Sequence, residues 1–335
     1  MAFELHDHWV WDFWLADDGE VHHLYYLHAP KLLGDPDLRH RFARIGHATS
    51  RDLRNWSDHG RVFDAGVPGA FDGSATWTGS VVRGPDGMWR MFYTGSRFLS
   101  PDNNANIETI GLATSPDLYS WTKQSGPICA ADATLYETLG TSDWPEEAWR
   151  DPWVFWREDD QLWHMLITAR GKKGTEPDRG VVAHAVSTDL SEWTVLPPLS
   201  DGDSGFAHLE VLQVIEIEGQ QHLIFCCDTA KMAGNRAGTQ GGIWTLPVDT
   251  MPAKVDPTAA RLLVDDHLYA GRIATDRDGA HWLMAFNNVV ENGGLWAASA
   301  TRCALSSGET AIWLWRFARE LGRFWFGCTR VRTRC

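Results

Sequence analysis

Several features that mark other classes of protein are scarce in this sequence. Basic residues are outnumbered: 30 Lys and Arg stand against 44 Asp and Glu, which gives a formal net charge of −14. Because nucleic acid is bound by basic surfaces, this balance argues against a nucleic-acid partner. Apolar runs long enough to span a membrane are absent, so we expect no membrane segment. The first ten residues, MAFELHDHWV, lack a basic stretch followed by an apolar one, and we therefore expect no secretory signal.

Cysteines are also few, and they are not spaced as metal ligands. The six cysteines include the neighbours Cys226 and Cys227 but no C-x-x-C pair, so they predict neither a zinc site nor a disulfide framework. Histidines cluster near the N-terminus, among them His6 and His8, but no third ligand follows at a suitable spacing. We expect no metal, no cofactor, and free thiols in a cytoplasmic protein. The oligomeric state is left open.

Tryptophan, by contrast, is abundant, with 19 residues in a chain of 335. The hydrophobic content of 44% and the charged content of 22% are those of a soluble globular protein. Surplus Trp is typical of proteins that bind flat apolar ring faces, sugars included, but it also serves core packing. The composition is therefore compatible with a small carbohydrate ligand without requiring one.

A repeated element organises the chain. The pattern S-x-D-L-x-x-W occurs at 50–56, 115–121 and 187–193, and successive copies begin 65 and 72 residues apart. Each copy is typical of a strand, a turn opened by Ser and Asp, and a Trp before the next strand. The spacing is too long for one hairpin and fits a four-stranded sheet. We expect the Asp residues of these copies to be structural.

Five hairpin units accompany these copies. They begin near residues 9, 77, 149, 208 and 269, and most have an acidic turn pair such as Asp18-Gly19 or Asp86-Gly87. Strand units recurring at this interval favour radial repetition over a two-sheet sandwich, which is the alternative all-β fold. The sequence therefore predicts an all-β, five-bladed β-propeller that occupies residues 1–294.

Three acids stand near the start of the first strand in their units: Asp12, Asp151 and Glu210. Asp is depleted in strands and costly to bury, so Asp12 between Trp11 and Phe13 requires a reason. In a propeller the first strand of each blade lines the axis, so the three carboxylates would converge in one pocket. Glycoside hydrolysis needs one ionised and one protonated carboxyl group, a pair that a crowded pocket can supply.

Short motifs around these acids resemble known enzymes. The segment VWDFW at 10–14 is similar to the nucleophile segment of glycoside hydrolase family 68, the levansucrases and their relatives. TWTGS at 76–80 is similar to the Trp-Ser-Gly-Ser segment of families 32 and 68, and WRDP at 149–152 matches their Arg-Asp-Pro motif. The chain thus resembles the five-bladed propeller enzymes of families 32 and 68, in a minimal form without the C-terminal β-sandwich of family 32.

This resemblance implies roles for individual residues. Asp12 would be the nucleophile that attacks a β-fructofuranosyl unit, and Asp151 would stabilise the transition state. Arg150 would orient these carboxylates. Glu210 would be the general acid/base of a retaining hydrolase or transferase, with Glu216 and Glu218 as rivals for that role. The residues expected to bind substrate are Trp11, Trp14, Trp77, Ser80 and Arg150. The three tryptophans are equally suited to core packing.

Two other functions stay open at this point. An inverting enzyme similar to family 43, acting on arabinofuranosides or xylosides, would use the same three carboxylates as base, pKa modulator and acid. A non-catalytic carbohydrate-binding propeller would keep the pocket without turnover. Either way the partner is a small carbohydrate.

The last segment, 295–335, differs in composition from the rest. It holds seven Arg, two Glu and three of the six Cys, with no Asp or Lys. It lacks the repeat pattern that the outer strands of a fifth blade would need, so we expect this blade to be incomplete. One hypothesis is that the tail is a frame-shifted translation, because codons allowed for GLWAASATR and SSGETAIWLW can spell other segments in another frame, the second of them with a hairpin turn. The alternative is a terminal helix around IWLWRFAREL.

Overall fold

The structure is a computed structural model that describes residues 3–291, 294–296, 312–320 and 323–327, with side chains to residue 288. Its regular elements are strands, and the helices among the described residues are short 3₁₀ turns. These turns are Lys31–Leu33, Pro36–His40, Glu176–Asp178, Thr229–Lys231, Gly234–Arg236 and Pro257–Ala259. None of the described helices has the length and apolar character needed to cross a membrane.

The strands form antiparallel four-stranded sheets, each arranged as a meander. The first sheet comprises β1 (His8–Asp17), β2 (His22–Pro30), β3 (Arg44–Ser50) and β4 (Ser57–Phe63). The second comprises β5 (Ala75–Arg83), β6 (Trp89–Phe98), β7 (Asn106–Ser115) and β8 (Thr122–Lys123). The third comprises β9 (Trp149–Arg157), β10 (Leu162–Arg170), β11 (Gly180–Ser187) and β12 (Thr194–Leu196). The fourth comprises β13 (Glu210–Ile217), β14 (Gln220–Cys227), β15 (Gly242–Val248) and β16 (Arg261–Asp265).

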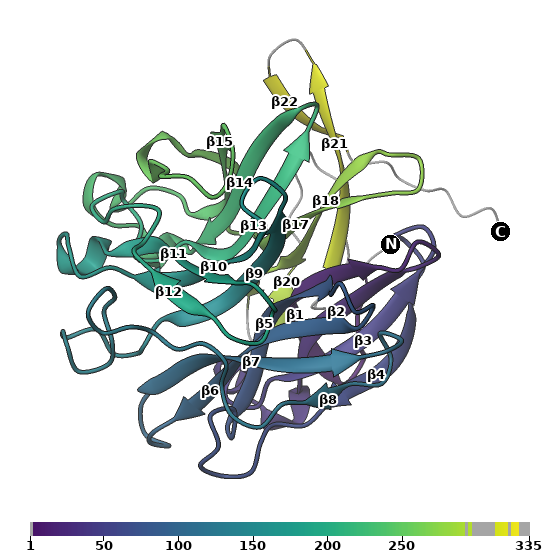
Figure 1. The fold of residues 1–335 in the computed structure, drawn as a ribbon, viewed down its shortest axis with the longest axis horizontal. Helices are drawn as coiled ribbons and strands as arrows, with labels where there is room; N and C mark the ends of the chain where they lie inside the picture. Colours follow the sequence, from purple (N-terminus) through teal and green to yellow (C-terminus); the bar gives the residue numbers. More distant parts are fainter. Residues whose placement is uncertain (1–2, 292–293, 297–311, 321–322, 328–335) are drawn as a thin grey trace.

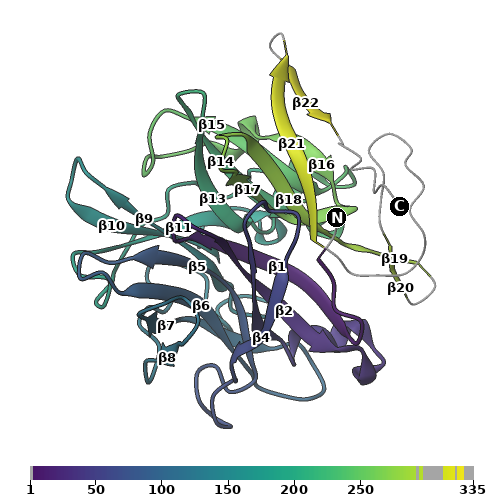
Figure 2. The same cartoon turned by 90° about the vertical axis from the view of Figure 1, so that its right-hand side faces the viewer.

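The C-terminal part of the chain forms one more sheet of this size. It comprises β17 (Leu268–Thr275), β18 (His281–Asn287), β21 (Ile312–Glu320) and β22 (Arg323–Gly327), while β19 (Val289–Glu291) and β20 (Gly294–Trp296) pair separately. The helix considered for IWLWRFAREL is therefore wrong, because residues 312–320 form a strand that pairs with β18. The expected lack of outer strands is not confirmed either, since β21 and β22 take those positions and project from the body in both views (Figure 1, Figure 2). The frame-shift hypothesis falls largely outside the described residues and stays a prediction.

The first strands of the sheets form a closed ring at the centre of the molecule (Figure 1). In this ring β1 contacts β5, β5 contacts β9, β9 contacts β13, β13 contacts β17, and β17 returns to contact β1. Each following strand lies farther from the centre, in the order of the chain. This radial arrangement confirms the predicted all-β propeller.

Every inner strand breaks register with its neighbour at one point. A bulge inserts an extra residue into a strand and thereby re-aims the side chains around it. The register shifts fall at Val10/Phe13 in β1, Trp77/Gly79 in β5, Arg150/Trp153 in β9, Glu210/Gln213 in β13 and Tyr269/Arg272 in β17. Three residues at these bulges, Asp151, Val211 and Ala270, have positive φ angles of 57°, 55° and 49°. The chain therefore accepts backbone strain at this level of the ring.

The S-x-D-L-x-x-W copies form the turns between third and fourth strands, as expected. In each copy the Asp accepts hydrogen bonds from the backbone N–H groups two and three residues later. The following Leu has a positive φ of 58° or 67° and is buried. The three copies thus close equivalent corners, and the structural role predicted for Asp52, Asp117 and Asp189 is confirmed.

Candidate active site

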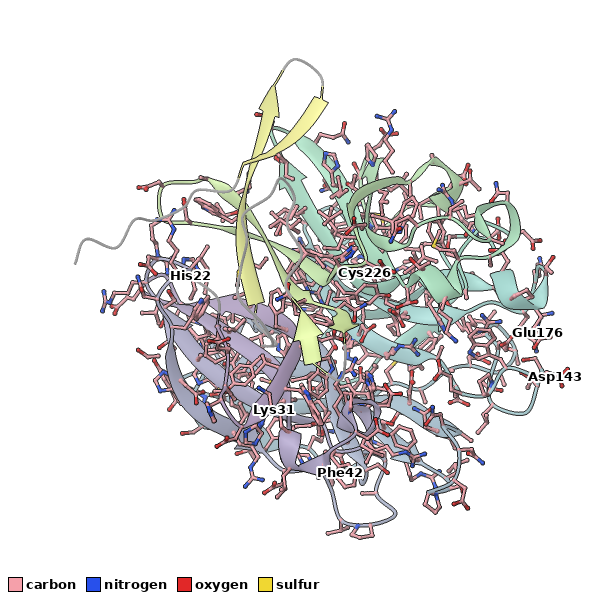
Figure 3. All side chains as sticks on the ribbon, turned by 180° about the vertical axis from the view of Figure 1, so that it is seen from behind. His22, Lys31, Phe42, Asp143, Glu176 and Cys226 are labelled. Carbon is pink, nitrogen blue, oxygen red and sulfur yellow. The ribbon has the colours of Figure 1, made fainter. Side chains whose placement is uncertain are left out.

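A pocket of about 510 Å³ opens over the ring of inner strands. Residues from the bulges of these strands line it, together with the loop before β3 and the loop before β9. Figure 3 labels Phe42, within the first of these loops, and Asp143, within the second, on separate parts of the molecule. The pocket brings together all three acids that the sequence singled out: Asp12, Asp151 and Glu210.

Asp12 lies in the bulge of β1, which explains how an acid fits into an apolar strand. The hydroxyl of Thr78, in the bulge of β5, donates a hydrogen bond of 2.7 Å to Asp12 Oδ2. Burial and the charges of Asp151 and Glu210 raise the pKa of Asp12 to about 7, while the hydrogen bond from Thr78 and the charge of Arg39 oppose this rise. Asp12 is therefore held close to the point at which it gains or loses a proton near neutral pH.

Asp151 is held by its own sheet and by the sheets on either side of it. The hydroxyl of Thr168 and the backbone N–H of Val211 both donate to its Oδ2, at 3.1 Å each. Its own N–H donates to Thr94 Oγ1 at 2.9 Å. Burial raises the pKa of Asp151 although the guanidinium of Arg150 opposes the rise. These contacts fix the position of this side chain before any ligand arrives.

Glu210 is bound through both carboxylate oxygens. Arg150 Nη2 donates to Oε1 at 2.6 Å, and the hydroxyl of Tyr269 donates to Oε2 at 2.5 Å. The side chain remains 21% exposed, so it is accessible from the pocket. The rivals Glu216 and Glu218 do not line the pocket, whereas Glu210 does.

Arg150 connects Glu210 to a fourth acid that the sequence analysis missed. Glu108 in β7 is fully buried, and its Oε2 accepts hydrogen bonds from Arg150 Nη1 at 3.1 Å and from the Trp149 N–H at 2.9 Å. Burial raises the pKa of Glu108 to about 7, against the opposing charge of Arg150. An acid within the apolar strand NIETIGLATS was the same signal that identified Asp12, and it could have identified Glu108.

Several other residues of the pocket were missed by the sequence analysis. Arg39 and His40 come from the loop before β3, and their environment includes Trp11, with the Arg39 guanidinium 5.7 Å from its ring centre. Trp77 lines the same wall, and its Nε1 donates to the His40 carbonyl at 2.8 Å. The further pocket residues missed by sequence reasoning include Thr78, Glu108, Glu146, Asp228 and Tyr269.

Two of the predicted substrate-binding residues do not reach the pocket. Trp14 is fully buried in the core, where it stacks on Tyr25 with ring centres 6.0 Å apart. Ser80 is also buried, and its hydroxyl accepts a hydrogen bond from the Val154 N–H, which joins β5 to β9. Substrate binding by Trp14 and Ser80 is therefore wrong. Trp11, Trp77 and Arg150 do line the pocket.

The arrangement defines a class of site: a propeller whose central pocket holds several carboxylates with different environments. In this set the pKa of Asp12 is raised to about 7, whereas Glu210 accepts hydrogen bonds from Arg150 and Tyr269, so the two carboxyl groups differ in environment. Comparison with known proteins identifies the family. The model of the glycosyl hydrolases family 32 N-terminal domain matches residues 15–300. The chain belongs to this family. The matched range contains Asp151 and Glu210 and begins just after Asp12.

Individual relatives are similar to parts of the chain. A β-fructofuranosidase of Arabidopsis thaliana, an insoluble isoenzyme, is 27% identical over 188 residues, covering 54% of this chain and 30% of that protein. An extracellular sucrase of Zymomonas mobilis is 26% identical over 278 residues, covering 70% of this chain and 65% of that protein. The chain thus spans less than two thirds of the length of either relative.

Solved structures share the fold. An inulosucrase from Halalkalicoccus jeotgali, bound to kestose, superimposes with a TM-score of 0.76 at 22% sequence identity. The superposition covers 97% of this chain and 90% of that chain.

Proposed function

We propose that this protein cleaves or transfers β-fructofuranosyl units by a retaining double displacement. The observation that carries the proposal is the convergence of Asp12, Asp151 and Glu210 at bulges of three inner strands that line one pocket. Membership of family 32 and the names of the relatives, a β-fructofuranosidase and a sucrase, support it. A small-molecule carbohydrate is the substrate.

In the first step the carboxylate of Asp12 attacks the anomeric carbon of the fructosyl unit. Glu210, in its protonated form, gives its proton to the glycosidic oxygen, and the bond to the leaving group breaks. Asp151 is fixed by Thr168 and Val211, so it can accept hydrogen bonds from ring hydroxyls and stabilise the developing positive charge.

In the second step Glu210 removes a proton from an incoming hydroxyl group. That oxygen attacks the anomeric carbon, the bond to Asp12 breaks, and the carboxylate of Asp12 is regenerated. Water as the incoming group gives hydrolysis, and a sugar hydroxyl gives transfer. Arg150 binds Glu210 at 2.6 Å and keeps this carboxylate in place through both steps.

We also infer that each four-stranded sheet is one blade, so that the propeller has five blades. The closed ring from β1 to β17 and back supports this count. Closure by β17 would leave no inner edge open. Deletion of residues 312–327 tests it, because loss of β21 and β22 should then lower the melting temperature of the whole ring.

A cytoplasmic location is a further proposal. It is supported by the free thiols of Cys129, Cys226 and Cys227, all of them buried. Fractionation of the source cells tests it, because an active pool outside the cytoplasm would contradict it.

The function is tested by sugar release from sucrose, inulin-type and levan-type oligosaccharides, arabinofuranosides and xylosides. We expect fructose from the fructosides, and we expect Asp12→Asn to lower the rate on the order of 10³-fold or more. Asp189→Asn is the matched control, because it makes the same acid-to-amide change in a turn. The side-chain oxygen of the new Asn can still accept the hydrogen bonds of that turn. Release of pentose would instead favour the inverting enzymes, and a folded but inactive protein would favour a binding module.

A further inference from the structure

Glu146 is one of the pocket acids that have no role in the two steps above. Glu146 lies in the loop before β9, lines the pocket, and has a side chain that is 25% exposed. Its Oε1 is 3.6 Å from Arg150 Nη1 and 3.6 Å from His208 Nε2, and both distances are longer than a hydrogen bond. Within the described part of the chain, no donor is within hydrogen-bond distance of this carboxylate. The carboxylate therefore keeps acceptor positions free of hydrogen bonds beside its 3.6 Å ion pair with Arg150.

The neighbour of Glu146 is equally unsatisfied. His208 is 2% exposed, and neither of its ring nitrogens has a hydrogen-bond partner among the described residues. Burial and the charges of Arg150 and Arg170 hold its pKa well below the usual range, so the ring is neutral and carries one N–H donor. Buried polar groups are normally paired, and the carboxylate of Glu146 lies 3.6 Å from Nε2 of this ring.

The loop that carries Glu146 is fixed on both sides. The ring of Trp144 packs against His208 at 5.2 Å and beneath the guanidinium of Arg170 at 3.6 Å. The N–H of Glu147 donates to the Asn106 carbonyl at 3.1 Å. Glu146 is thus held at the pocket wall by rigid neighbours although its own carboxylate makes no hydrogen bond.

The positions of the charged residues in the pocket indicate which part of the substrate lies next to Glu146. Arg150 lies between Glu210 and Glu146: its Nη2 is 2.6 Å from Glu210 Oε1 and its Nη1 is 3.6 Å from Glu146 Oε1. The anomeric carbon must lie between Asp12 and Glu210, and the glycosidic oxygen next to Glu210. The group beyond that oxygen therefore extends toward Arg150 and Glu146.

We propose that Glu146 binds the hydroxyls of the sugar joined to the fructosyl unit, and that His208 positions its carboxylate. This sugar is the leaving group during cleavage and the acceptor during transfer. The inference rests on the proposed function. Two neighbouring groups are not available for this role, because Glu108 is fully buried and the Nη atoms of Arg150 are occupied by Glu108 and Glu210.

The test compares two substrates that differ only in the leaving group. Sucrose carries a glucose with several hydroxyls, and 4-nitrophenyl β-D-fructofuranoside carries none. Glu146→Gln removes the charge and keeps the shape, so we expect kcat/KM for sucrose to fall about 10-fold while kcat/KM for the aryl fructoside stays unchanged. The ratio of transfer to hydrolysis at high sucrose should fall as well.

Glu147→Gln is the matched control. Glu147 is the next residue, and its carboxylate accepts from the Leu139 N–H instead of facing the pocket, so both substrates should be cleaved at the original rate. Equal losses on the two substrates in Glu146→Gln would overturn the assignment, as would no loss on either. If the unaltered chain cleaves neither substrate, the proposed function itself fails, which is a different outcome.

The positioning role of His208 has its own pair of variants. His208→Gln keeps an N–H donor beside Glu146, whereas His208→Leu does not. We expect His208→Leu to reproduce the selective loss on sucrose and His208→Gln to retain most of the activity on it. A loss in His208→Leu that affects the aryl fructoside equally would show a general structural defect and contradict the positioning role.

Discussion

The acids of the pocket and the acids of the turns have opposite environments. In the turns, the carboxylate of Asp189 accepts from the N–H groups of Glu192 and Ser191, and these hydrogen bonds lower its pKa. In the pocket, Asp12 accepts from one hydroxyl, is partly buried beside other acids, and has its pKa raised to about 7. The same type of side chain therefore stabilises a turn in one region and has a raised pKa in the other.

The backbone repeats the comparison. Each repeated turn places a Leu at positive φ between satisfied hydrogen bonds, whereas the bulges place Asp151 and Val211 there to aim groups into the pocket. The strained backbone conformation recurs once in each of the three equivalent turns, whereas at the bulges it lies beside the candidate catalytic groups. The four predictions below alter one region at a time.

The largest expected effect is at the proposed general acid/base. Glu210→Gln cannot protonate the glycosidic oxygen, so kcat for sucrose should fall about 10²–10⁴-fold. An aryl fructoside needs less protonation of its leaving group and should still react in the first step, which a burst of nitrophenol would report. Equal losses with both substrates would contradict the role of Glu210.

The second effect is on stability: Asp12→Asn should make the folded protein more stable although it lowers the activity. Because the pKa of folded Asp12 is about 7 and its ordinary value is 3.8, ionisation destabilises the folded protein increasingly between these pH values. Asp12→Asn removes this cost, so it should raise the free energy of unfolding at about pH 8 by up to about 4 kcal/mol. Thermal unfolding at about pH 8 and pH 4 checks this, and a larger gain at the lower pH would contradict it.

Removal of a turn acid should lower the stability and leave the activity unchanged, in contrast to Asp12→Asn. Asp189→Ala removes the acceptor for two backbone N–H groups, so it should cost about 1 kcal/mol of stability and leave kcat unchanged. The pKa of Asp189 is lowered by these hydrogen bonds. Its contribution is therefore present above the usual Asp value and is lost as the pH falls below it. The difference in melting temperature from the unaltered chain should shrink in acid, and a persistent difference there would point to another cause.

The smallest expected effect is a shift in a pH profile. Thr78 donates to Asp12 and so favours its ionised form. Thr78→Val keeps the shape but removes the donor, which should move the acid limb of the kcat/KM profile upward by about one pH unit. An acid limb at the original pH would show that it reports a group other than Asp12.

The sequence predicted the repeated architecture well because its signals are local. Turn pairs, the S-x-D-L-x-x-W copies and the acids Asp12, Asp151 and Glu210 can all be recognised within a few residues. Bulges are different, because they depend on the pairing of two strands. Trp14 follows Asp12 by two residues, and simple alternation would place both on one face, yet Trp14 is fully buried in the core.

The loops were beyond local reasoning for a different reason. Arg39 and His40 reach the pocket from the connection between β2 and β3, and Glu146 reaches it from the connection before β9. Their positions depend on closure of the whole ring, which no short segment encodes. Glu108 is an exception, since its place in an apolar strand was visible.

The most direct test of the account is to trap the covalent intermediate on Asp12. Glu210→Gln is incubated with 4-nitrophenyl β-D-fructofuranoside, digested and analysed by mass spectrometry. The account predicts that the peptide containing Asp12 gains the mass of one fructosyl residue and that fragmentation places it on Asp12. Attachment to another residue, or a turnover product of inverted configuration without any adduct, would contradict it.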